Sequence, residues 1–169
     1  YAALFQRLGG TLVQGDAATL TAQSAGWSVQ TDVGRLDAEQ AVITLGPWSD
    51  GVLRRLGYRL PLFVKRGYHR HYRGGAGPNL PWYDADRGLM IASMRQGVRV
   101  TTGAEFARRD APSTPWQLTH AERAARELLD LGQPMEDRPW LGARPCTADM
   151  KPVIGRAPGH RGLWLNIGH

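Results

Sequence analysis

Short β-prone segments separated by turn residues recur along most of this chain, and this pattern constrains the fold more than any other feature. The pattern predicts strands at Thr11–Gln14, Ala18–Ala22, Trp27–Thr31 and Gln40–Leu45, as in a small antiparallel meander. A long strand is predicted over Leu60–Tyr72, and shorter ones follow at Pro81–Asp84, Gly88–Ser93, Val98–Thr102, Trp140–Arg144, Pro152–Ile154 and Leu163–Asn166. We therefore expect an α+β protein with two sheets built from alternating parts of the chain.

Three segments predict helices. Tyr1–Leu8 repeats apolar residues at helical spacing, and Asp50–Leu56 follows Ser49, a favourable capping residue. A third helix is expected to begin at the capping box Thr119–Glu122. Ala41–Leu45 is apolar nearly throughout, which favours a strand buried on both faces, as in a parallel sheet.

The composition excludes several classes of protein. Apolar residues make up 42% of the 169 residues and charged residues 21%, which is ordinary for a globular protein and unlike a disordered chain. No apolar run approaches the ~20 residues that a membrane-spanning helix needs. The single cysteine, Cys146, rules out an intramolecular disulfide framework and any CxxC motif.

The net charge of +6 is concentrated in one stretch. Residues 51–83 carry seven Lys and Arg, no Asp or Glu, and several interleaved aromatic residues. Three interpretations are open: a strand with a solvated basic face, a site for an anionic ligand such as a carboxylate or pyrophosphate, and a surface that binds nucleic acid. Charge alone does not imply a reader of bases.

Familiar catalytic motifs are absent. The chain contains no GxGxxG, Walker A, HExxH or GxSxG motif and no zinc-ligand spacing. His69 and His71 are two residues apart and would share a strand face. Because no carboxylate is near them in the sequence, we predict no metal site.

Four segments in order are more informative than any single motif. They are Ala41–Ser49, Leu60–Tyr68, Trp140–Asp149, and Pro152–Gly155 followed by Gly162–His169. Together they resemble the D-amino-acid oxidase superfamily of FAD-dependent amine oxidoreductases. Bacterial D-amino acid dehydrogenases match best, with glycine and sarcosine oxidases nearby. The Arg-Pro-x-Thr-x-Asp run in the third segment, with the following Ile-Gly and Gly-His, is the specific part.

The resemblance implies three regions. Residues 1–59 would form part of an FAD-binding, Rossmann-like domain, residues 60–139 an antiparallel substrate-binding sheet with a helix, and residues 140–169 a return to the FAD-binding domain. The family's N-terminal GxGxxG unit and its glycine-rich C-terminal end have no counterpart here. We therefore expect a piece of a longer protein, with FAD binding and activity belonging to the complete parent.

The resemblance also implies which residues contact FAD. Glycine turns suit such contacts because no Cβ stands between backbone and cofactor. The implied cofactor-binding residues are Gly46, Pro47, Trp48, Arg66, Gly67, Gly155, Gly168 and His169.

Arg144 is the implied substrate-binding residue. Guanidinium binds a planar carboxylate through two parallel hydrogen bonds, and the arginine of the Arg-Pro pair does so above the flavin in this family. Tyr68 or His69 would line the same cavity. The alternative for Arg144 is a surface arginine paired with Asp149, and the alternative for Tyr68 is a core residue with its hydroxyl at the edge.

The reaction that the resemblance implies is oxidation of the CH–NH bond of an amino acid to an imino acid, which water converts to a 2-oxo acid and ammonia. The flavin would carry the chemistry, so no catalytic side chain is predicted. The implied location is cytoplasmic, with peripheral association at the inner face of the cell membrane as an option.

Two alternatives remain at this stage. One is an FAD oxidase of glycine or sarcosine type, or of another small amine or hydroxy acid such as glycerol phosphate. The other belongs to a different class, a non-catalytic basic module that binds nucleic acid.

Overall fold

A computed structural model describes all residues, 1–169, and divides the chain into two units. The first consists of residues 1–62 and 147–169, and the second of residues 63–146. The second unit includes Trp140–Cys146, which pairs with the long strand over seven residue pairs. The structural boundary therefore lies at residue 147 rather than at the expected residue 140.

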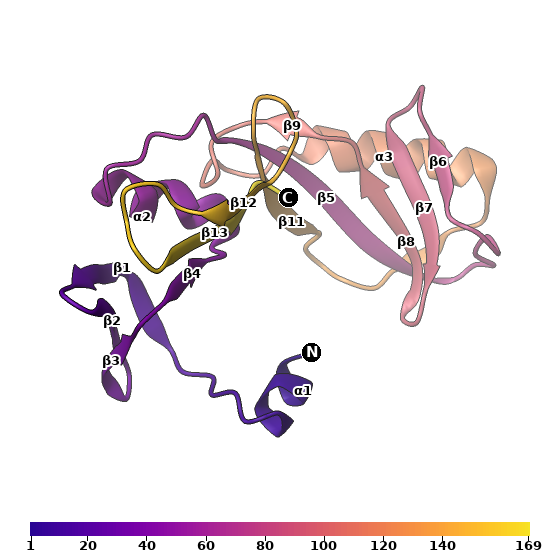
Figure 1. Cartoon of the computed structure of the whole chain (residues 1–169). Coiled ribbons are helices and arrows are strands. Elements are labelled where there is room, and N and C mark those ends of the chain that lie inside the picture. The colour runs from indigo at the N-terminus through magenta and orange to yellow at the C-terminus, as the bar shows by residue number, and fades with distance from the viewer. The chain divides into compact units, whose positions relative to one another are not determined.

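The second unit, here called the sheet unit, is an antiparallel sheet with one helix (Figure 1). Its strands are β5 (Phe63–Gly74), β6 (Trp82–Asp84), β7 (Leu89–Met94), β8 (Gly97–Thr102), β9 (Glu105–Phe106), β10 (Gly132–Pro134) and β11 (Trp140–Cys146). The order is β10-β5-β8-β7-β6, and β9 and β11 also pair with β5. Helix α3 (Pro115–Leu128) packs on the face formed by β5, β8 and β7. This confirms the predicted α+β class.

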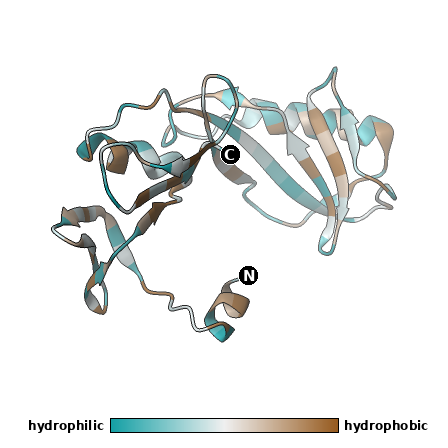
Figure 2. Ribbon diagram, viewed as in Figure 1, coloured by the Kyte–Doolittle hydropathy of each residue, from teal (hydrophilic) through white to brown (hydrophobic).

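The core of the sheet unit lies between this sheet and α3. Ile91, Val100 and Leu131 are fully buried in it, together with Ala125 of the helix. Figure 2 shows hydrophobic residues along β7, where alternate side chains face the core. The opposite face of the sheet is not covered by a helix of this unit.

The first unit contains two three-stranded sheets. Strands β1 (Gly15–Gln23), β2 (Gly26–Thr31) and β3 (Gly34–Ala38) form an antiparallel meander. Its third strand, β3, was not predicted, and the segment Gln40–Leu45 that was expected there contributes β4 to the other sheet. Strands β12 (Val153–Arg156), β13 (Leu163–Ile167) and β4 (Ala41–Ile43) form the other sheet, in that order. The helical segments are α1 (Ala2–Arg7), the 3₁₀ turn η1 (Gly46–Trp48) and α2 (Ser49–Arg55).

Strand β4 has the parallel partner that its apolar sequence suggested. It pairs with β13, with Ala41 opposite Leu163 and Ile43 opposite Leu165. Ile43 is buried, but Val42 is 59% exposed. The strand is therefore buried on one face only, which corrects the expectation of burial on both.

Two local predictions were wrong. Residues 11–14 form no strand, because the apolar Leu12 and Val13 stay exposed without a partner strand. Helix α3 begins at Pro115 and not at Thr119, whose hydroxyl donates a hydrogen bond to the carbonyl of Pro115 inside the helix. Proline at the first turn is itself a strong helix start, because its missing N–H is not needed there.

No helix of the structure combines the length and the apolar character needed to cross a membrane.

The core of the sheet unit allows a first test. We expect Ile91→Ala to lower the free energy of unfolding by about 2–5 kcal/mol, because it removes buried methyl groups and leaves a cavity. Met90→Ala is the matched control, since the neighbouring side chain points to the other face and is 43% exposed. Urea denaturation of both variants measures the difference, and equal effects would contradict this placement of the core.

Candidate functional site

Strand β5 separates two sets of side chains. Successive residues of a strand point to opposite faces of the sheet. Tyr68 and Tyr72 are buried on the face toward α3. Lys65, Gly67 and His69 therefore lie on the other face, here called the open face of the sheet.

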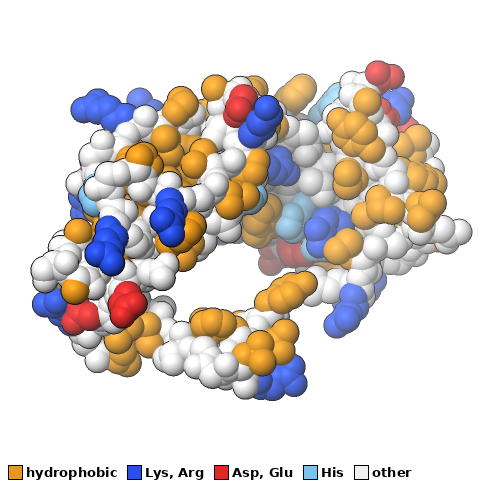
Figure 3. Space-filling model, viewed as in Figure 1, with side chains coloured by type: hydrophobic (Ala, Val, Ile, Leu, Met, Phe, Trp, Pro, Cys, Tyr) orange, Lys and Arg blue, Asp and Glu red, His pale blue; other side chains and the backbone are white.

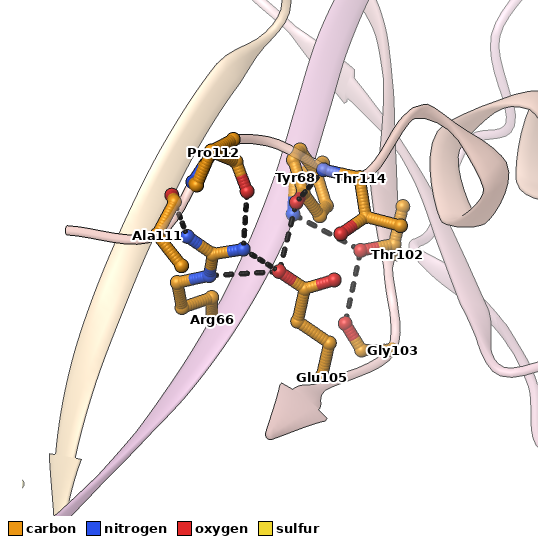
Figure 4. A network of polar contacts seen from close by, with 8 residues as sticks. All are labelled: Arg66, Tyr68, Thr102, Gly103, Glu105, Ala111, Pro112 and Thr114. Carbon is orange, nitrogen blue, oxygen red and sulfur yellow. Dashed lines mark hydrogen bonds and ion pairs between the residues drawn. The ribbon is translucent and has the colours of Figure 1, made fainter. Parts of the chain in front are cut away.

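Arg66 and Tyr68 belong to a buried polar network on the α3 side (Figure 4). Glu105 accepts a 2.7 Å hydrogen bond from Nε of Arg66 and a 2.8 Å bond from the hydroxyl of Tyr68. The Arg66 guanidinium also bonds the carbonyls of Ala111 and Pro112. Only 1% of the Arg66 side chain is exposed, and 11% of that of Glu105.

The electrostatics of this network favour an ionised Glu105. Burial alone would raise the pKa of its carboxyl, but hydrogen bonds from Tyr68 and Arg66 outweigh burial and lower the pKa. A buried charge pair with its hydrogen bonds satisfied fixes the loop of residues 103–114 against β5. The network is structural, and its donors are already used.

This placement revises two expected site residues. Arg66 was expected to contact FAD and Tyr68 to line a substrate cavity, but both side chains point into the network on the opposite face from Gly67 and Arg144. Tyr68 is 1% exposed, and its hydroxyl also accepts a 2.7 Å bond from the backbone N–H of Thr114. The core alternative therefore describes Tyr68 better.

Arg144 reaches across the open face to Gly67. In the β5–β11 register, Arg144 is opposite Lys65 and Gly142 is opposite Gly67. A Cβ atom on Gly67 would stand 3.1 Å from both terminal guanidinium nitrogens of Arg144. The guanidinium thus lies over Gly67, where no side chain intervenes. It takes part in no hydrogen bond or ion pair within the sheet unit.

His69 lies next to this guanidinium along the open face. Its imidazole stacks on the indole of Trp140, its partner across the two strands, with ring centroids 4.6 Å apart. The indole in turn covers Gly142, where a Cβ would meet ring atoms at 1.9 Å. The facing pair Gly67 and Gly142 thus forms a glycine patch, over which the Arg144 guanidinium and the Trp140 indole lie, with His69 beside the indole.

Trp140 and Gly142 were missed as site residues by sequence reasoning, as was Glu105 as the partner of Arg66. The sequence does contain a pattern that indicates Trp140 and Gly142. Once Arg144 is placed on a strand, the period of two puts residues 142 and 140 on the same face. The pairing of Arg66 with Glu105 joins residues 39 apart, and no local pattern indicates it.

The predicted cofactor residues of the first unit lie in η1, within β12 and directly after β13. Gly46 has φ +53° and Gly155 has φ +147°, and a Cβ at either position would meet nothing within 4 Å. Such open backbone fits close approach of a cofactor. Pro47 and Trp48 complete η1, and Trp48 is 59% exposed.

The last two predicted cofactor residues follow β13. Gly168 has φ +82°, and His169 is hydrogen-bonded through Nε2 to Oδ1 of Asn166 at 2.6 Å. The open backbone at Gly46 and Gly155 is compatible with contact to a cofactor. No phosphate-binding glycine loop is among these residues, so they fit only a part of the cofactor.

The surface carries the positive charge that the composition indicated. Figure 3 shows basic side chains spread over the face in view, with fewer acidic ones. Within the basic stretch, however, Arg66 and Arg70 are turned inward, where Arg70 bonds Glu122 and the carbonyls of Glu136 and Asp137. No group of three or more His, Cys, Asp or Glu side chains is arranged to hold a metal ion.

Comparison with known proteins gives consistent results. The sequence model of the family described as FAD dependent oxidoreductase matches residues 1–169. A glycine oxidase from Pseudomonas putida is 36% identical over 143 residues, which is 83% of this chain and 39% of that protein. A D-amino acid dehydrogenase from Cereibacter sphaeroides is 34% identical over 156 residues, covering 83% of this chain and 33% of that protein.

Solved structures agree in fold. The glycine oxidase from Geobacillus kaustophilus superposes with a TM-score of 0.67 at 23% identity, over 91% of this chain and 42% of the other. The L-proline dehydrogenase from P. horikoshii reaches 0.74 at 16% identity, over 99% of this chain and 47% of the other. The chain spans a third to two fifths of the length of the Pseudomonas putida and Cereibacter sphaeroides relatives.

The buried network gives a pH-dependent prediction. Because the pKa of Glu105 is lowered on folding, its ionised form stabilises the fold above the ordinary glutamate value of 4.5, and this contribution is lost as the pH falls through the folded-state value. We expect Glu105→Gln to cost about 3 kcal/mol at pH 7, by leaving Arg66 without its counter-charge. The difference in free energy of unfolding between this variant and the parent protein should decrease below pH 4.5.

Urea titrations at several pH values measure this effect. Asp110→Asn is the control, because Asp110 is exposed and paired only with its neighbour Arg109 at the surface. A constant Glu105→Gln effect from pH 7 to pH 3 would contradict the proposed ionisation.

Proposed function

Because the chain belongs to the family of FAD-dependent oxidoreductases, we propose that it carries the substrate-binding sheet of an enzyme that oxidises the CH–NH bond of an amino acid. The product is an imino acid, which water converts to a 2-oxo acid and ammonia. The reaction is of the D-amino acid dehydrogenase type.

The position of Arg144 is the observation that supports this proposal most. Its guanidinium lies over Gly67 on the open face and has no carboxylate partner in the sheet unit. Guanidinium binds carboxylates through two parallel hydrogen bonds. An unpaired guanidinium on a flat, glycine-lined patch therefore suits the acid end of a small amino acid.

A second cation strengthens the preference for an anion. Lys65 stands directly opposite Arg144 in the strand pair, and its ammonium lies 5.4 Å from the ring centroid of Phe106. Like charges at facing positions repel each other. With two cations at facing positions, the open face favours anionic over neutral ligands.

FAD supplies the two-electron acceptor of the reaction. On the side of the protein, the open backbone at Gly46 and Gly155 of the first unit is proposed to contact the cofactor. Arg144 holds the carboxylate and so fixes the orientation of the substrate Cα–H bond. Positioning of this kind contributes to the rate without an acid or base side chain.

The named relatives leave two substrate types open. One is called a glycine oxidase and the other a D-amino acid dehydrogenase. Both substrate types carry a carboxylate next to an amine, and Arg144 would bind the carboxylate of either. An oxidase of glycine or sarcosine type is therefore the alternative, and oxygen consumption with glycine, sarcosine and D-alanine distinguishes the two.

Removal of the Arg144 guanidinium tests this proposal. In the flavin-loaded protein, we expect Arg144→Ala to raise KM for amino acids about 100-fold, because two hydrogen bonds to a charged group are lost. Flavin absorbance should be unchanged, since the proposed cofactor contacts do not include Arg144. Steady-state kinetics with a series of D-amino acids and glycine measure the change.

Arg35→Ala is the matched control, because Arg35 is an exposed arginine of β3 paired with Asp37. Its KM should equal that of the parent protein. An unchanged KM in Arg144→Ala would remove Arg144 from the substrate site.

A further inference from the structure

A second side chain of the open face is placed to contact the substrate beside Arg144. His69 is two residues from Gly67 on β5, and the Arg144 guanidinium lies over Gly67. Two residues of a strand span about 7 Å. A cation and an imidazole thus stand side by side on the same face of the sheet.

The imidazole of His69 is held between two rings. Trp140 stacks on it at 4.6 Å with an interplanar angle of 22°, and His71 meets it edge-on at 5.3 Å with an angle of 78°. Trp140 is itself fixed over Gly142. None of the hydrogen bonds of the chain uses a ring nitrogen of His69, so the ring is positioned but its nitrogens are available to a ligand.

The neighbouring His71 is held in one tautomer. Arg99 can only donate, and its Nε lies 3.1 Å from Nε2 of His71, so that nitrogen accepts. The other ring nitrogen, Nδ1, then carries the proton and donates it to Glu136 at 2.7 Å. His71 is buried, and both of its ring nitrogens are bound within the protein.

The surroundings favour the neutral form of His69. Burial lowers the pKa of His69, the positive charge of Arg99 and the coupling to His71 lower it further, and Glu136 opposes them. Arg144 and Lys65 are the other charged groups on this face near His69. A neutral imidazole has one nitrogen that accepts a hydrogen bond or a proton.

An α-amino acid has the dimensions to join the two groups. Its nitrogen and its carboxylate carbon are about 2.5 Å apart. With a hydrogen bond of about 2.9 Å at each end, it reaches across roughly 8 Å. With its carboxylate on Arg144, its amine therefore reaches the imidazole.

We propose that His69 accepts a proton from the ammonium group of the amino acid that Arg144 holds. This inference rests on the proposed function. One N–H bond of the ammonium breaks, an N–H bond forms on the imidazole, and the electron pair stays on the amine nitrogen. No oxidation occurs in this step. The half-buried imidazolium returns its proton to solvent, and the free amine has the lone pair that imine formation requires.

The same contact selects the substrate class. A hydroxy acid offers Arg144 the same carboxylate but no ammonium proton to His69. The pair Arg144 and His69 therefore favours amino acids over 2-hydroxy acids.

Flavin reduction by a saturating D-amino acid under anaerobic conditions tests the role of His69. We expect His69→Gln to slow reduction about 100-fold at pH 7, because general acid–base assistance contributes at least that factor. The loss should disappear at a pH above the pKa of the free ammonium group, where the amine needs no acceptor. His120→Gln is the control, since His120 is an exposed residue of α3 stacked on Trp116.

Binding of propanoate, which has a carboxylate and no amine, separates the two proposals without measuring activity. Propanoate binding, followed by the flavin absorbance change, should be unchanged in His69→Gln and at least 10-fold weaker in Arg144→Ala. Weaker propanoate binding in His69→Gln would show that His69 only shapes the Arg144 site. An unchanged rate of flavin reduction in His69→Gln at pH 7 would equally contradict its role as proton acceptor. Unchanged propanoate binding in Arg144→Ala would instead refute the proposed function.

Histidine-selective NMR of the 169-residue chain gives a further readout that needs no flavin. The ring resonances of His69, identified by their loss in His69→Gln, should titrate below the ordinary histidine value of 6.5. Trp140→Ala should raise that midpoint, because it exposes the ring. A midpoint at or above 6.5 in the parent chain would contradict the proposal.

Discussion

Strand β5 is hydrogen-bonded to four other strands, and the rest of the sheet unit depends on this constraint. Strands β11 and β10 pair with it, and so do β8 and β9. A slip of one residue would exchange the two faces of β5. It would place Arg66 and Tyr68 on the open face and force Gly67 into the polar network. Such a slip would disrupt the hydrogen bonds of β5 to four strands. The register therefore keeps the buried network on one face and Gly67 and His69 on the other.

The division between the faces explains which parts of the site the sequence could predict. Arg144 and His69 were predicted because each lies in or beside a recognisable motif, and the strand register places both on the open face. Arg66 and Tyr68 come from the same motif, but alternation along the strand turns them to the core. The two-residue period of a strand, counted from Gly67, is enough to assign Arg66 and Tyr68 to one face and His69 to the other.

Much of the fold followed from local patterns, and the exceptions have physical reasons. The long strand, the hairpins and the three helical segments were predicted because turn residues and apolar periodicity are local signals. The parallel pairing of β4 with β13 joins segments more than 100 residues apart, and Glu105 reaches Arg66 over 39 residues. Such pairings are determined by packing between distant segments. The basic stretch of residues 51–83 could not be interpreted from local sequence for the same reason. Arg66 and Arg70 form hydrogen bonds within the protein and are not part of one charged surface.

The open face is less favourable to stability than the core face. Lys65 and Arg144 are like charges at facing positions, Gly67 and Gly142 contribute no side-chain packing, and half of the Trp140 side chain is exposed. Glycines in strand interiors and facing cations each weaken a sheet. On the other side of β5, the buried network and the α3 core provide compensating stability. A chain shaped by stability alone would place larger, β-branched residues at 67 and 142 and a carboxylate opposite Lys65. The choice of glycine and arginine at these positions is therefore best explained by a ligand whose carboxylate the Arg144 guanidinium binds.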